Sequence, residues 1–127
     1  MLALSVHNDA KADLKRSPTA AAKIVALLEQ LRADEDLLDR LTQQDYGAYQ
    51  SEAFHVTQWF EQQRAGRNLW RLKVWELEDM GRKYRVVYAF KPREKHLYIL
   101  GVVPRGEFDY DQDSFSQRIL SAYDKLR

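Results

Sequence analysis

Apolar positions recur with a helical period in the first third of the chain and with a period of two in its second half. A helix is expected from Ser17 and Pro18 onward, because proline at the first helical position gives up no hydrogen bond. Its apolar stripe has the i, i+3, i+4, i+7 spacing of one helix face and consists of Ile24, Leu27, Leu28 and Leu31. Leu38 and Leu41 continue this stripe, and Asp34 either caps a separate short helix or lies within one longer helix.

The start of the chain predicts a short apolar strand over residues 2–6 and a brief helix over about 9–16. Asn8 or Asp9 is expected to cap that helix, since a short acceptor side chain satisfies free N–H groups there. Residues 43–67 show no clear period, and we interpret them as a connection with a short strand or helical turn near 53–62.

Three strands are expected over residues 68–77, 83–90 and 96–103, the last apolar on both faces as in a central strand. Their links, EDMGR and KPRE, are short, which indicates antiparallel neighbours. Asp113 or Ser114 then caps a last helix, whose apolar stripe is formed by Phe115, Ile119, Ala122, Tyr123 and Leu126. Helices followed by three strands and a helix predict an α+β fold, with an N-terminal strand and helices packed on an antiparallel sheet.

Composition fits one domain spanning residues 1–127. The chain has 127 residues, of which 45% are hydrophobic, and it has no cysteine, so disulfides and thiol chemistry are excluded. No basic segment followed by an apolar run opens the chain, and no apolar window is long enough to span a bilayer. A cytoplasmic protein that makes no membrane contact is therefore expected.

Positive charge is concentrated in the predicted sheet. The formal net charge is only +1, but residues 68–105 carry nine basic and four acidic side chains. The segments before and after this one each contain two more acidic than basic side chains. A basic sheet is the kind of surface that binds polyanions.

Alternation of side chains along a strand assigns these basic residues to one face. Trp70, Leu72 and Val74 share the face that packs on helices, as do the apolar residues of the next strand. The opposite, exposed face should collect Arg71, Lys73, Trp75 and Arg85, together with Arg105 at the end of the third strand and Tyr110 beyond it. Surface ion pairs of Arg71 and Arg85 with Glu76, Glu78 or Glu107 are the alternative interpretation.

Such a set suits RNA cleavage by the RNA's own 2′-hydroxyl, which needs a base, cations for the developing phosphorane charge and an acid for the leaving oxygen. Arginine and lysine bind phosphates and stabilise that charge, and tyrosine can stack on a base. The sequence predicts no histidine or carboxylate at this site, so a lysine or tyrosine would have to act as the base.

No metal or cofactor is expected. His7, His55 and His96 are scattered singly, without a second ligand at a typical spacing. Asp109, Asp111 and Asp113 lack the glycine and glutamate of a calcium loop. Trp59 and Trp70 are expected in the core or at an interface, whereas Trp75 is the one tryptophan expected on the basic face.

Five segments together resemble the RelE/ParE superfamily of toxins from type II toxin–antitoxin systems. They are VHNDAKADLKR, LWRLKVWEL, YRVVYAF, ILGVVPRGEFDYD and RILSAYDKL. The resemblance covers the chain apart from about residues 43–67, and it rests on the order and spacing of the segments.

The resemblance implies a metal-independent endonuclease that cuts mRNA in the ribosomal A site and inhibits translation. The matching positions are Lys73, Arg85, Arg105 and Tyr110 as catalytic residues and Arg71 in substrate binding. Strand alternation, not the resemblance, adds Trp75 as a second candidate for substrate binding. It further implies that Lys73 or Tyr110 helps to activate the 2′-hydroxyl, Arg85 stabilises the phosphate, and Arg105 serves the leaving group. The spacing from Arg105 to Tyr110 differs by one residue from that of some relatives.

The resemblance also implies a protein partner, a cognate antitoxin that covers or distorts this face and contacts the C-terminal helix. DNA contact would occur only through the complex with the antitoxin. Two alternatives stay open: a ParE-type inhibitor of DNA gyrase, or a binding module without catalysis, such as a decayed toxin. The near-neutral charge departs from strongly basic RelE-type nucleases, while the retained basic set favours the nuclease over the gyrase inhibitor.

Overall fold

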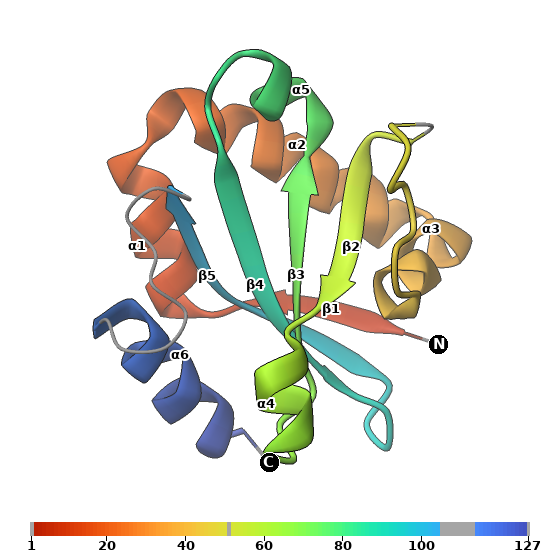
Figure 1. Ribbon diagram of the computed structural model, residues 1–127, viewed down its shortest axis with the longest axis vertical. Helices are drawn as coiled ribbons and strands as arrows, with labels where there is room; N and C mark the ends of the chain where they lie inside the picture. The colour runs from red at the N-terminus through yellow and green to blue at the C-terminus, as the bar shows by residue number, and fades with distance from the viewer. Residues whose placement is uncertain (1, 51, 105–113, 127) are drawn as a thin grey trace.

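Helices cover a five-stranded mixed sheet in the computed structural model, which describes residues 2–50, 52–104 and 114–126 (Figure 1). The strands are Ala3–Val6 (β1), Phe54–Gln58 (β2), Leu69–Val74 (β3), Tyr84–Lys91 (β4) and His96–Pro104 (β5). The helices are Asn8–Arg16 (α1), Pro18–Ala33 (α2), Glu35–Asp39 (α3), Phe60–Arg64 (α4), Trp75–Asp79 (α5) and Ser114–Asp124 (α6), with a 3₁₀ turn at Arg40–Thr42. The expected α+β class is confirmed.

The sheet has the strand order β1-β5-β4-β3-β2. Strands β3 to β5 form the expected antiparallel meander, and β5 is the expected central strand. Strand β2 adds a fourth antiparallel neighbour beside β3, which the sequence did not predict. The expectation of an antiparallel sheet is wrong for β1, which runs parallel to β5 with Ala3 opposite His96. Parallel neighbours need a long crossover, and here nearly the whole domain lies between the two strands in sequence.

Helix starts follow local capping chemistry. His7, rather than Asn8 or Asp9, caps α1, and its Nδ1 accepts a hydrogen bond from the Asp9 N–H at 3.1 Å. Asp34 caps a separate helix, α3, because its carboxylate accepts from the Leu37 N–H. None of the described helices has the length and apolar character needed to cross a bilayer.

The first core lies between the sheet and α1–α3, on what we call the α2 face of the sheet. The predicted stripe of α2 is buried there against Trp70, Leu72 and Val74, as alternation predicts. Tyr88 is fully buried in this core and donates a hydrogen bond to the Leu41 carbonyl at 2.6 Å. Burial raises the pKa of the Tyr88 hydroxyl well above its ordinary value, so this donor keeps its proton.

A second core lies on the opposite side, the α6 face, where Ile119 and Ala122 of α6 pack on β4 and β5. A bulge in β5 places Leu100 as the extra residue, since Val87 faces Gly101 while Tyr88 faces Ile99. Gly101 allows the close approach of α6, because a Cβ there would lie 2.6 Å from Phe115 Cζ.

Asp13 ties three elements together. This buried carboxylate of α1 accepts a hydrogen bond from the Val102 N–H of β5 at 2.9 Å and two from the Arg118 guanidinium of α6 at 3.0 and 2.6 Å. The tie fixes α6 over the β5 end of the α6 face. The lower left of Figure 1 shows α6 there, away from β2 and β3.

One expected strand ends early. The prediction of a strand over 68–77 is wrong from Trp75 onward, where the chain turns into α5. Alternation stops there: Glu76 occupies a position that would face the α2 core, whereas Leu77 is buried. A helical turn satisfies both, since it leaves Glu76 exposed and directs Leu77 inward. The unassigned stretch near 53–62 contains both a strand, β2, and a helical turn, α4.

Candidate nucleic-acid interface

Three nitrogen-bearing side chains form a row across β2, β3 and β4 on the α6 face. His55 pairs directly with Lys73 in the antiparallel register of β2 and β3. Arg71 pairs with Val87 and Leu72 with Val86, the last recorded pair of β3 and β4, so Arg85 follows one step further along β4, on the same face as Lys73. Neighbouring strands are about 4.8 Å apart, so the paired residues His55 and Lys73 have Cβ atoms about 5 Å apart. A single phosphodiester segment can contact both.

A second row adds Arg71, which faces Thr57 across the same two strands. The Arg71 Nε donates a hydrogen bond to Thr57 Oγ1 at 3.1 Å, and Arg71 and Lys73 are both half-buried. Alternation therefore places Arg71, Lys73 and Arg85 on one face, as predicted from the sequence. These stems are held against the sheet, which limits the conformational entropy that binding would cost.

Trp75 closes the row at the start of α5. Its indole N–H donates to the Gly47 carbonyl at 2.8 Å, and the Lys73 ammonium lies 4.6 Å from the ring centroid. The His55 ring stacks on it with centroids 5.8 Å apart and planes 3° apart. Trp75 thus lies on the predicted face, held between the β3 lysine, the β2 histidine and the loop that contains Gly47.

That loop comes from the stretch in which the sequence showed no pattern. Asp45 has a φ of 65°, and its carboxylate lies 3.3 Å from His55 Nε2. Two backbone bonds pin the loop to β2: the Asp45 N–H donates to the Val56 carbonyl at 2.8 Å, and the Val56 N–H donates to the Tyr46 carbonyl at 2.9 Å. Burial, followed by a hydrogen bond and charge from Glu52, raises the pKa of Tyr46. The loop thus bounds the site beside His55 and Trp75.

Sequence reasoning missed His55 as a member of this site and considered it only as a metal ligand. The signal that places it there is the register of β2 against β3, which puts residue 55 opposite residue 73. A strand of five residues between irregular segments does not reveal that register in sequence.

Arg85 differs from expectation in its burial and in its pairing with a carboxylate. It lies on the predicted face but is buried, with 8% of its surface exposed, so the expectation of exposure is wrong. Its Nη1 lies 3.2 Å from Glu78 Oε1, and the Glu78 side chain is itself only 11% exposed. The other carboxylate oxygen of Glu78 is buried and has no hydrogen-bond partner in the described part of the chain. Glu78 therefore neutralises much of the charge that Arg85 brings to the row.

The remaining two predicted site residues, Arg105 and Tyr110, lie outside the described residues. Arg71, Lys73, Trp75 and Arg85 are brought together. Over residues 2–50, 52–104 and 114–126, no group of three histidine, aspartate or glutamate side chains is arranged to hold a metal ion. The described site combines cations, an imidazole and an aromatic ring with the carboxylates of Asp45 and Glu78.

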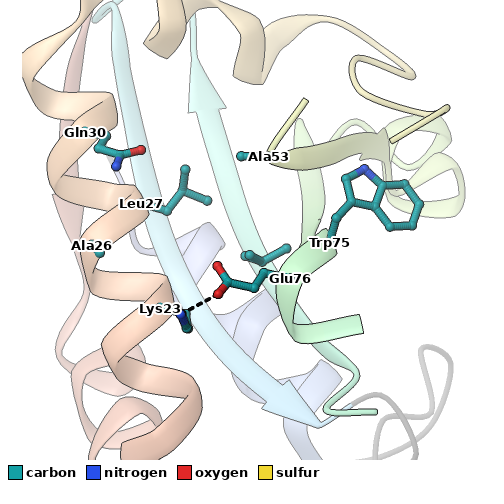
Figure 2. Close-up of a pocket in the computed structure, with 8 residues that line it drawn as sticks. Lys23, Ala26, Leu27, Gln30, Ala53, Trp75 and Glu76 are labelled. Atoms are coloured by element: carbon teal, nitrogen blue, oxygen red, sulfur yellow. Dashed lines mark hydrogen bonds and ion pairs between the residues drawn. The ribbon is translucent and has the colours of Figure 1, made fainter. Parts of the chain in front are cut away.

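A pocket of about 360 Å³ lies behind Trp75, between α2 and the start of α5 (Figure 2). Leu27, Val74 and Ala53 give it an apolar floor, and an ion pair between Lys23 and Glu76 crosses its mouth. Trp75 is among the residues that line this pocket, and its ring extends to the side away from α2 (Figure 2). Trp75 therefore borders both the pocket and the row.

No protein-family model, characterised protein or solved structure matches the chain.

Proposed function

We propose that the chain is the toxin of a type II toxin–antitoxin system and acts as an endonuclease on ribosome-bound mRNA. The observation that supports this most is the row of His55, Lys73 and Arg85 with Arg71 and Trp75 beside it. Arg71 and Lys73, two residues apart on one face of β3, suit consecutive phosphates of a single strand, and a half-buried indole suits a base.

Within this proposal, Lys73 and Arg71 make the main phosphate contacts. Both are half-buried and so reach the surface, whereas only 8% of Arg85 is exposed. Arg85 then adds only part of its positive charge to the row, because Glu78 neutralises much of it. Arg105 keeps the leaving-group role that the RelE/ParE resemblance implies. An antitoxin that covers the α6 face would silence the toxin, with α6 in the interface.

The ion pair between Arg85 and Glu78 favours a second candidate, a module that binds without cutting. A ParE-type action on DNA gyrase belongs to the same group of alternatives. Induced expression separates the three, with protein synthesis and DNA synthesis measured independently. The nuclease stops protein synthesis first, the gyrase inhibitor stops DNA synthesis first, and the binding module stops neither.

The double variant Arg71→Gln/Lys73→Gln tests the proposed phosphate contacts. Glutamine keeps much of each stem but removes both charges, so we expect binding to mRNA-programmed ribosomes to fall at least about tenfold. The slope of log affinity against log salt should become shallower by about one to two units. Fluorescence titration at several salt concentrations measures both quantities.

The matched control is Lys15→Gln/Arg32→Gln, which removes two exposed charges from α1 and α2. It changes net charge equally but leaves the α6 face intact, so its affinity should stay near that of the wild type. Equal losses in the two double variants would show that only net charge matters and would count against the proposed site. Thermal melting confirms that both variants are folded.

A further inference from the structure

We propose that His55 is the proton acceptor for the attacking 2′-hydroxyl in this site, an inference that rests on the proposed nuclease function. The sequence predicted no histidine at the site. The fold supplies one, directly opposite Lys73 and stacked on Trp75.

Asp45 fixes the tautomer of this histidine. An ionised carboxylate can only accept hydrogen bonds, so the 3.3 Å contact with Asp45 Oδ1 places the ring proton on Nε2. The lone pair of a neutral imidazole then lies on Nδ1. A carboxylate behind an imidazole is a common way to orient a general base.

Nδ1 is the ring nitrogen left for a substrate. It makes no hydrogen bond within the described part of the chain, and it is not among the fully buried side-chain atoms that lack a partner there. The His55 side chain as a whole is only 15% exposed, so its ring is largely enclosed.

The surroundings of His55 keep this geometry rigid. Asp45 is pinned by its backbone bond to Val56, and the Trp75 ring is fixed by its bond to Gly47. Lys73, on the adjacent strand, supplies a cation one side-chain spacing away, where a phosphate next to the 2′-hydroxyl would lie. A base next to a phosphate-binding cation is the pairing that in-line cleavage of RNA requires.

Nδ1 of His55 takes the 2′-hydroxyl proton as the O2′–P bond forms. The P–O5′ bond breaks, and the leaving oxygen takes a proton from solvent. The products are a 2′,3′-cyclic phosphate and a 5′-hydroxyl, and the imidazolium returns its proton to solvent.

Single-turnover cleavage of mRNA on programmed ribosomes tests the role of His55. Removing a general base costs roughly 100-fold or more. We therefore expect His55→Ala and His55→Gln each to slow cleavage by about this factor while affinity for the programmed ribosome stays within about twofold. Added imidazole should recover part of the rate of His55→Ala, where the ring has left space, but not that of His55→Gln, where the new side chain fills it.

His96→Ala is the matched control, because His96 is also a strand histidine with a stacked aromatic neighbour, Tyr98, but lies at the start of β5. It should cut at the wild-type rate.

Cleavage by His55→Ala and His55→Gln at the wild-type rate would overturn the role of His55 and leave the nuclease intact. No cleavage by the wild-type protein would overturn the nuclease function and this role with it. Melting temperatures equal to that of the wild type show that the variants are folded. If His55→Ala is unstable, His55→Gln still tests the role of the ring, because its amide can donate a hydrogen bond to Asp45.

Discussion

Replacing Gly47 with alanine is expected to lower the free energy of unfolding by about 3 kcal/mol, because two penalties coincide at this position. The backbone has a φ of +76°, which a residue with a Cβ adopts only with strain. A Cβ there would also lie 1.9 Å from the Phe54 carbonyl oxygen, a backbone atom that cannot rotate away. Urea unfolding monitored by tryptophan fluorescence measures the loss.

Gly66→Ala is the control for this prediction. Gly66 has a φ of +88°, but a Cβ there would meet no atom within 4 Å. It should therefore show only the conformational penalty, about 1 kcal/mol. Equal losses of unfolding free energy at the two positions would mean that the loop moves at no cost to admit the Cβ at residue 47. That result would contradict a fixed loop beside Asp45 and Trp75.

The Gly47 variant also has a functional consequence. The Gly47 carbonyl accepts the Trp75 indole N–H, and Asp45 precedes it by two residues. Displacement of this loop should therefore loosen the stack of Trp75 and His55, and cleavage should fall even at temperatures where the variant is folded.

Glu78→Ala is expected to cost about 3 kcal/mol of stability. Removing one partner of a buried ion pair leaves the other charge without compensation, and Arg85 is 8% exposed. Arg85→Ala should also destabilise, because it leaves the buried Glu78 carboxylate alone. The double variant Glu78→Leu/Arg85→Met should recover most of the loss, since apolar groups can replace a buried pair at little cost.

Glu76→Ala is the control on the same helix. Glu76 is 61% exposed and pairs with Lys23 across the pocket, so its removal should cost less than about 1 kcal/mol. Chemical denaturation of the four variants gives the comparison. A loss at Glu78 no greater than that at Glu76 would contradict a buried, mutually dependent pair, and Arg85 would then be available to bind phosphate.

Alternation along single strands was the most dependable guide from sequence to structure. It placed Arg71, Lys73 and Arg85 on one face because side-chain direction within a strand follows from the pleat alone. Helical spacing of apolar residues likewise identified the stripes of α2 and α6 that fill the two cores. These features depend on neighbours in sequence, and they survive folding unchanged.

Features that depend on distant partners were not predictable in this way. The burial of Arg85 comes from Glu78, whose position depends on the change from β3 to α5 at Trp75. The parallel pairing of β1 with β5 joins segments that are more than ninety residues apart. Membership of His55 in the site depends on the register of a five-residue strand. In each case the deciding contact is tertiary, and a single sequence does not contain its geometry.

The most direct test of the proposed function uses the purified protein and ribosomes that hold a defined mRNA codon in the A site. We expect the mRNA to be cut within that codon, with a 2′,3′-cyclic phosphate on the upstream fragment. The Arg71→Gln/Lys73→Gln variant should leave the mRNA intact at the same protein concentration. Uncut mRNA with the folded wild-type protein, or equal cutting by the double variant, would contradict the account.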